Sequence, residues 1–196
     1  MKHTLWILTL AMLAPAVVLA QAQKPSDDAL KQSELPSHAD AESPRQRPGV
    51  QQGYLQVGDL AQDFELDGSK GKAVKLSQLR GDWLLLAFAD RKEAAAKLRP
   101  IHDKLAAHGA RIALVCHEKS GSLKRYAQQQ KLPFLLLADV TGEVASVYGL
   151  WDGRGSRTLE GFLLLDRRGV VRQIFVDQVT PPEQVGEMAM STITHH

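Results

Sequence analysis

The sequence predicts an α/β fold: a mixed central sheet of about five strands, helices on both faces, and an N-terminal β-hairpin. One observation is the run Trp83–Asp90, which is almost entirely apolar, as strands buried on both faces of a sheet are. Another is the segment 91–108, where apolar residues recur at helical spacing. They form a single stripe, which consists of Ala94, Leu98, Ile101 and Leu105. Similar apolar runs alternate with helical segments further along the chain, as in α/β proteins.

The chain begins with a segment that has the features of a secretory signal peptide, residues 1–20. Lys2 and His3 precede an apolar stretch, which ends in small residues where a signal peptidase cleaves. The stretch is at the lower limit for a membrane span, and Pro15 interrupts it, so we expect cleavage rather than an uncleaved anchor. The expected consequences are export to a bacterial periplasm and no stable membrane insertion afterwards.

Residues 21–53 are polar, rich in Pro, Ser, Gln, Asp and Lys, and contain no aromatic residue. Such a segment buries too little apolar surface to offset the entropy of ordering, so we expect a disordered linker. The folded domain is expected over residues 54–190, followed by a tail over 191–196. Alternating apolar residues over 64–66 and 74–76, with glycines between them, predict the hairpin that opens it.

The remainder of the domain is expected to continue the alternation. In chain order we expect a strand over 112–116, a helix over 121–130, a strand over 134–139, a short helix over 142–148, a loop over 150–160, a hairpin over 161–177 and a last helix from Pro181.

Composition excludes several classes of function. A net charge of +2 over 196 residues gives no reason to expect nucleic-acid binding. A single cysteine, Cys116, rules out an internal disulfide and a cysteine-rich metal site. The internal histidines lack the spacing of metal ligands, so we expect no metal and no bound cofactor.

Several segments carry a family resemblance. The stretch 57–81, the step Phe88-Ala89-Asp90, the segments 148–151 and 162–169, and the helical residue Pro100 are similar to the thioredoxin-like superfamily. Within it the chain resembles the peroxiredoxin or redoxin type, described as alkyl hydroperoxide reductase/thiol-specific antioxidant proteins. The resemblance runs almost unbroken to about residue 177. It implies a thioredoxin-like fold and an oxidoreductase or antioxidant activity.

The residues that would carry this activity differ from the family pattern. In thioredoxins a proline follows the second cysteine of Cys-x-x-Cys by five residues, and Pro100 resembles that proline. Counting back from it places the pair at Lys92-Glu93-Ala94-Ala95. These side chains form neither a thiolate nor a disulfide. We therefore interpret these positions as an active site without its thiols.

A second position points the same way. Aligned on the end of the Trp83 strand, the Pro, Thr and Cys positions of peroxiredoxins fall near Asp90, Ala94 and Lys97. The residue before the Gly161 strand would be a cis-proline in thioredoxins and a pKa-lowering arginine in peroxiredoxins. Here it is Glu160, whose carboxylate would raise the pKa of a neighbouring thiol.

Three other groups are candidate sites. Asp90 and Arg91, with the neighbouring Lys92 and Glu93, form either an anion-binding or acid/base cluster or a solvated helix start. Cys116 beside His117 is either a single catalytic thiol or a small buried apolar residue. A third group, in the loop, is either a binding surface or a packed tryptophan with solvated arginines, and consists of Trp151, Arg154 and Arg157.

The residues favour a redox-inactive binding or accessory module over an enzyme. Its expected partner is an unidentified protein of the cell envelope, and a homodimer is another expected assembly. One alternative is a one-cysteine thiol oxidoreductase or peroxidase that uses Cys116. A further alternative is a small-ligand binder that uses the helix N-terminus, residues 90–95, and the arginine loop.

Overall fold

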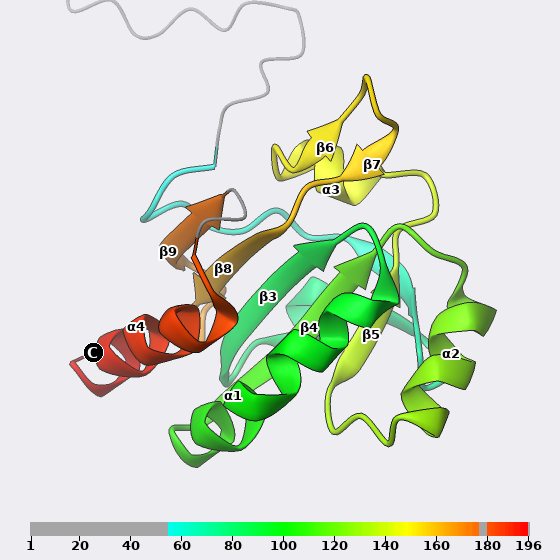
Figure 1. The fold of residues 1–196 in the computed structure, drawn as a ribbon. Helices are drawn as coiled ribbons and strands as arrows, with labels where there is room; N and C mark the ends of the chain where they lie inside the picture. The colour runs from blue at the N-terminus through cyan, green and yellow to red at the C-terminus, as the bar shows by residue number, and fades with distance from the viewer. Residues whose placement is uncertain (1–54, 177–179, 196) are drawn as a thin grey trace, which may run out of the picture. The chain divides into compact units, whose positions relative to one another are not determined.

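The computed structural model describes residues 55–176 and 180–195 (Figure 1). The expected signal peptide and linker, residues 1–53, lie outside the described residues. The fold is built on a seven-stranded mixed sheet with the order β2-β1-β5-β4-β3-β8-β9. Its strands are β1 (Glu65–Gly68), β2 (Ala73–Lys75), β3 (Trp83–Ala89), β4 (Ala110–Cys116), β5 (Leu135–Ala138), β8 (Gly161–Leu165) and β9 (Val171–Val176).

The predicted fold class is confirmed, and the sheet has more strands than expected. β3, β4 and β5 are parallel, whereas β8 is antiparallel to β3 and β9 to β8. The N-terminal hairpin β1–β2 joins this sheet because β1 pairs with β5, with Asp67 opposite Ala138. The five expected core strands and the two hairpin strands thus form one sheet.

Strand β3 occupies the centre because its sequence is apolar at every position. All of its residues are buried, and successive side chains point to opposite faces of the sheet. Leu85 and Ala87 face one hydrophobic cluster, and Leu84 and Leu86 face the other. Helices or loops therefore have to cover both faces.

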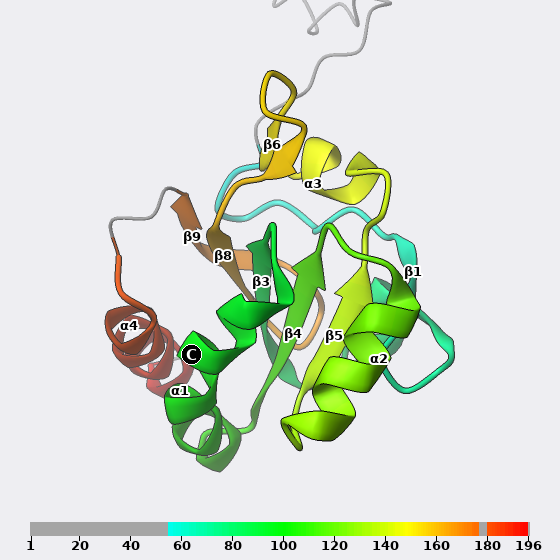
Figure 2. The same cartoon turned by 45° about the vertical axis from the view of Figure 1, so that its right-hand side comes forward.

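Three helices cover the first face: α1 (Ala95–Ala107), α2 (Ser120–Gln129) and α4 (Pro182–Thr194). In α1 the predicted stripe is buried at Leu98, Ile101 and Leu105. Helix α4 lies beside α1 in both orientations of the ribbon (Figures 1 and 2). It extends past residue 190, the expected end of the domain, because Ile193 in its last turn packs against this core.

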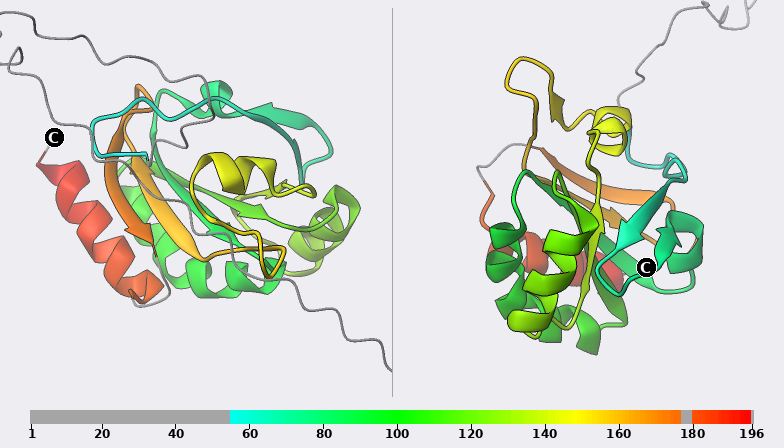
Figure 3. Two further views of the ribbon diagram at one scale, coloured as in Figure 1. Left: turned by 90° about the horizontal axis from the view of Figure 1, so that it is seen from above. Right: turned by 90° about the vertical axis from the view of Figure 1, so that its right-hand side faces the viewer.

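Shorter elements cover the second face: the 3-10 helix η1 (Leu76–Leu79) and helix α3 (Glu143–Val147). Seen from above, α1 and the β1–β2 hairpin lie on opposite sides of the central strands (Figure 3, left). Tyr148, which follows α3, packs against Phe88 with 5.2 Å between ring centroids, and its hydroxyl donates to the carbonyl of Gln62 at 2.7 Å. Helices thus lie on both faces, as predicted.

The segment 150–160, expected to be a loop, contains a two-stranded ribbon of β6 (Trp151–Asp152) and β7 (Arg157–Thr158). Asp152 explains the ribbon, because its Oδ1 accepts the backbone N–H groups of Arg154 and Gly155 and so closes the turn. In the part of the chain that the structure describes, no helix has the length and apolar character needed to cross a membrane.

Candidate functional site

The site lies where β3 ends and α1 begins. A single 3-10 turn, η2 (Lys92–Ala94), joins the two, and the carboxyl ends of β3 and β4 point toward the edge where α3 and the β6–β7 ribbon lie (Figure 1). In α/β sheets ligands bind at this edge. Pro100 lies inside α1, the helix that leaves β3, as the register drawn from the sequence requires.

A pocket of about 280 Å³ opens at this turn, and we call it the charged pocket. It brings together residues from the β3–α1 turn and from the β7–β8 connection. Its lining contains six candidates from the sequence, namely Asp90, Arg91, Glu93, Ala94, Arg157 and Glu160, together with Lys97, Thr158 and Leu159. Residues 63 positions apart meet here, since Lys97 Nζ donates to Glu160 Oε1 at 3.1 Å.

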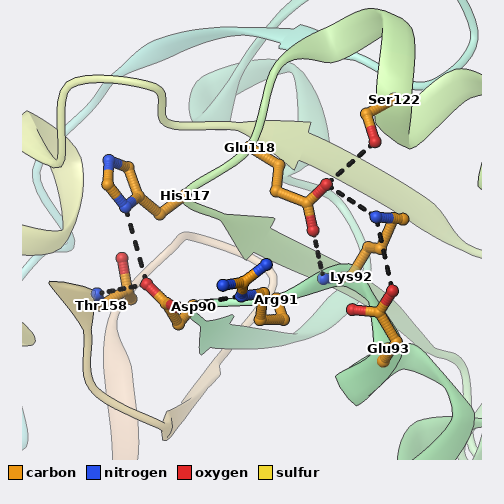
Figure 4. Close-up of polar contacts among 8 residues, drawn as sticks. All are labelled: Asp90, Arg91, Lys92, Glu93, His117, Glu118, Ser122 and Thr158. Atoms are coloured by element: carbon orange, nitrogen blue, oxygen red, sulfur yellow. Dashed lines mark hydrogen bonds and ion pairs between the residues drawn. The ribbon is translucent and has the colours of Figure 1, made fainter.

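Lys92 belongs to the same turn, but its side chain is held by the β4–α2 connection (Figure 4). Its Nζ donates to Glu118 Oε2 at 2.9 Å, and its backbone N–H donates to Glu118 Oε1 at 3.0 Å. Ser122 Oγ donates to the same carboxylate at 2.9 Å. The Lys92 ammonium also lies 5.8 Å from the centre of the Tyr126 ring. These contacts fix the start of α1 to the start of α2.

The electrostatics agree with this geometry. Burial by itself raises the pKa of Glu118. The hydrogen bonds donated by Lys92 and Ser122 lower it by more than burial raises it, so the net pKa lies below the usual range. The hydrogen bond to Glu118 raises the pKa of Lys92. Both groups are therefore charged over a broad pH range, and the pair is a lasting feature of the site.

Asp90 links the strand end to the second wall of the pocket. Its Oδ1 accepts the backbone N–H of Thr158 at 3.2 Å and lies 3.6 Å from Nδ1 of His117 (Figure 4). Its Oδ2 lies 3.5 Å from Nε of Arg91. The Thr158 hydroxyl is buried and has no hydrogen-bond partner in the described residues. A residue of the pocket lining thus carries a buried hydroxyl whose hydrogen-bonding capacity is unused in the described residues.

Cys116 does not line the charged pocket. It is fully buried among apolar side chains on the face that α1 and α2 cover. Burial, and secondarily the charge of Glu118, raises the pKa of its thiol well above the usual value. His117 is directed elsewhere, and its ring meets that of Trp151 edge-on at 4.9 Å. Cysteine and histidine therefore do not form a nucleophile–base pair in this arrangement.

The remaining candidates are placed as follows. Ala95 is buried in the core beneath the turn. Trp151 is half-buried and lies over Gly142, where a Cβ would be 2.4 Å from the indole ring. Arg154 is exposed in the turn of the β6–β7 ribbon. Neither Trp151 nor Arg154 lines the charged pocket, so the pocket includes only Arg157 from the expected loop surface.

Two residues of the candidate site were not predicted from the sequence. Glu118 follows β4 at the edge where ligands bind, and this position is the only signal that would have indicated it. Thr158 carried no signal, because its contact with Asp90 spans 68 positions.

The family model described as the AhpC/TSA family matches residues 57–174. The chain belongs to the AhpC/TSA family. It is similar to the chloroplastic peroxiredoxin Q of Triticum aestivum, with 29% identity over 75% of this chain and 72% of that protein. It is also similar to peroxiredoxin Bcp of Escherichia coli, with 27% identity over 63% of this chain and 86% of the relative.

Solved structures show the same fold for this AhpC/TSA family protein. Peroxidoxin BcpB from Mycobacterium tuberculosis superimposes with a TM-score of 0.64 at 19% identity, over 72% of this chain and 97% of the other. Enterococcus faecalis AhpC superimposes with a TM-score of 0.63 at 15% identity, over 72% and 96%. The predicted thioredoxin-like fold of the peroxiredoxin type is thereby confirmed.

Proposed function

We propose that this AhpC/TSA family protein is a redox-inactive binding or accessory module. The observation that carries the proposal is the state of Lys92, which stands at the expected position of the first cysteine. Its ammonium group is held at 2.9 Å by the carboxylate of Glu118. A lysine supplies no thiolate and no disulfide partner, and this one is committed to a structural ion pair.

The second altered position supports the same conclusion. The family resemblance implies a cysteine near Lys97 and an arginine at Glu160. In this chain the two residues form an ion pair with Nζ 3.1 Å from Oε1. The charges are thus opposite to those of a thiolate facing an arginine, and the arrangement favours ion pairing over peroxide chemistry.

The alternative of a one-cysteine oxidoreductase depends on Cys116. Attack on peroxide needs an accessible thiolate, whereas burial and the raised pKa keep this thiol protonated and enclosed. We therefore favour binding over catalysis.

The charged pocket is the binding surface we propose for a partner. It presents both signs of charge, because Arg91 and Glu93 are exposed in its lining. Such a surface suits a polar protein segment, because complementary charges provide specificity. We propose a protein of the cell envelope as the partner, with a second copy of this chain as a further candidate. The proposed periplasmic location rests on residues 1–20.

Peroxide consumption and insulin reduction by the purified chain test the absence of thiol chemistry. We expect both rates to equal those of the Cys116→Ser variant, because the thiol takes no part. An active peroxiredoxin assayed in parallel controls for the reductant. Turnover in the wild-type protein that Cys116→Ser abolishes would contradict the proposal.

A gain-of-function variant tests the register. Lys92→Cys combined with Ala95→Cys places two thiols at the start of α1, where the helix dipole lowers a thiol pKa. We expect a disulfide between them and measurable insulin reduction, whereas each single variant should show neither. If the double variant folds but keeps all three thiols free under oxidising conditions, Cys116 included, the register is wrong.

A further inference from the structure

A second cavity, of about 530 Å³, lies between residues 62–66 and residues 139–148. It shares no lining residue with the charged pocket. Four carboxylates line it, and no lysine, arginine or histidine does; the four are Asp63, Glu65, Asp139 and Glu143. We call it the acidic cavity. Its lining favours a positively charged occupant.

Asp139 gives the cavity a group that lacks a partner. This residue follows β5 and is 1% exposed. Its Oδ2 accepts the backbone N–H of Ala145 at 2.8 Å, which stabilises the start of α3. Its Oδ1 is buried and accepts no hydrogen bond in the described residues. Helix capping explains the first oxygen only, and leaving a buried carboxylate oxygen without a hydrogen bond is unfavourable.

The other carboxylates differ in how far they are already engaged. Asp63 Oδ1 accepts the N–H groups of Phe64 and Ser77, and the hydrogen bonds from Ser77 lower its pKa. Glu65 lies 3.6 Å from Nζ of Lys75. Glu143 is exposed and has no ion pair in the described residues. The cavity lining therefore contains a buried carboxylate oxygen that no described residue engages, on Asp139, and an exposed carboxylate without an ion pair in the described residues, on Glu143.

The remaining walls are largely apolar. Phe64 and Leu66 come from one side and Val144 and Val147 from the other, and Val147 is 44% exposed. Among the described residues, no three acidic, histidine or cysteine side chains are placed to hold a metal ion. Apolar walls around a carboxylate suit an alkyl chain that ends in a cation, rather than a hydrated metal.

We propose that the acidic cavity binds an alkylammonium group, with the nitrogen donating to Asp139 Oδ1 and the alkyl chain lying along Val144 and Val147. The same chemistry is found in a lysine side chain and in a free alkylamine. Binding satisfies the buried oxygen of Asp139, and a charged donor makes the stronger kind of hydrogen bond.

Titration of the full chain with n-pentylammonium, followed by NMR of the amides of residues 139–148, tests the proposal. We expect saturable shifts there, and none with n-pentanol at the same concentrations. Asp139→Asn should weaken binding about tenfold or more, because the amide still accepts from Ala145 but carries no charge. Glu187→Gln, which removes an exposed charge from α4, should change nothing.

Val147→Lys provides a second variant, since this side chain is exposed and its replacement leaves Asp139 and its cap intact. The new ammonium group should compete with the ligand and weaken binding. Parallel titration with Nα-acetyl-lysine methylamide distinguishes a lysine side chain of a protein from a free alkylamine as the natural ligand. Tighter binding of the lysine derivative than of pentylammonium indicates a lysine of a protein. Absence of saturation in the wild-type protein, equal binding of pentanol, or unchanged affinity in a folded Asp139→Asn variant would overturn the proposal.

Discussion

Lys92 and Glu118 illustrate how a single pair can define a local structure. The Lys92 and Glu118 side chains are 23% and 15% exposed, so each is partly removed from water. Two hydrogen bonds from Lys92 and one from Ser122 satisfy the carboxylate. Removing one partner of such a pair leaves the other partly buried without compensation, and that loss outweighs what an exposed ion pair contributes.

We therefore expect Lys92→Met to lower the free energy of unfolding by about 1 kcal/mol at neutral pH, as measured by urea denaturation. The folded-state pKa of Glu118 is depressed, so its contribution is present above the unfolded-state pKa and is lost as pH falls through the folded-state value. The difference between wild type and variant should shrink below about pH 4. Lys119→Met, at an exposed neighbouring position, is the control; an equal loss there would argue against the pair.

Gly142 provides a second prediction at this scale. Its φ of +73° is unfavourable for other residues, and a Cβ would meet the ring of Trp151 at 2.4 Å. Gly142→Ala should therefore destabilise the chain by about 1–3 kcal/mol in thermal or urea unfolding. Gly121→Ala is the matched control, because nothing lies within 4 Å and alanine favours the helix. A neutral Gly142→Ala variant would contradict both the strain expected at this φ and the close contact with Trp151.

Among the elements, α4 depends on a close approach to α1. Gly186 in α4 faces Ile101, and a Cβ would lie 3.1 Å from the isoleucine side chain. Alanine would gain up to about 1 kcal/mol of helix propensity against this crowding, so its net effect should be small. A larger side chain cannot fit without moving α4.

Gly186→Leu should accordingly destabilise the protein by about 1–3 kcal/mol in urea unfolding, because overpacking outweighs propensity. Glu187→Leu introduces the same side chain at the adjacent exposed position and should cost little. If both variants unfold alike, the α1–α4 contact is not tightly packed.

Elements with a local signal could be predicted from the sequence. The run of β3 and the stripe of α1 depend on neighbouring residues, and both formed where expected. The pairing of β1 with β5 could not be predicted, because no local pattern specifies which strand lies beside which. Asp152 closes the β6–β7 turn through backbone groups within three positions. This turn is therefore a local feature that the sequence could have predicted.

The candidate site divides in the same way. Residues 90–95 could be located by counting from Pro100, and Glu160 by counting from its strand. The contact of Glu118 with Lys92 could not be predicted, since it spans 26 positions, although the place of Glu118 after β4 marks it as a residue of this edge. Counting along the sequence identifies which residues lie at the carboxyl ends of the strands. Which of these residues contact one another depends on how the strands are arranged in the folded sheet.

For the whole molecule, Asp166 is expected to contribute to the response to acid, because its pKa is lowered in the folded state. It is 8% exposed. Burial alone would raise its pKa, but N–H donors from Val170, Arg172 and Arg168 lower it below the usual range. Its stabilising contribution is therefore complete above the unfolded-state pKa and is lost as pH falls through the folded-state value.

Asp166→Asn should lower the free energy of unfolding at pH 7 by about 1–3 kcal/mol and flatten its dependence on pH below about 4. Urea unfolding at a series of pH values measures both effects. Asp103→Asn, at an exposed position of α1, is the control. If the free energy of unfolding of Asp166→Asn falls with decreasing pH as it does in the wild-type protein, other carboxylates cause the response to acid.

The sheet ends at β2, which spans only Ala73–Lys75 and pairs with β1 alone. Lysines stand at its end and just before it, at positions 75 and 72. Short, positively charged margins of this kind discourage strand addition and the aggregation that follows from it. A second copy of the chain is thus not expected to attach by extending the hydrogen-bonded ladder at β2, whereas β9 (Val171–Val176) forms the opposite edge of the sheet.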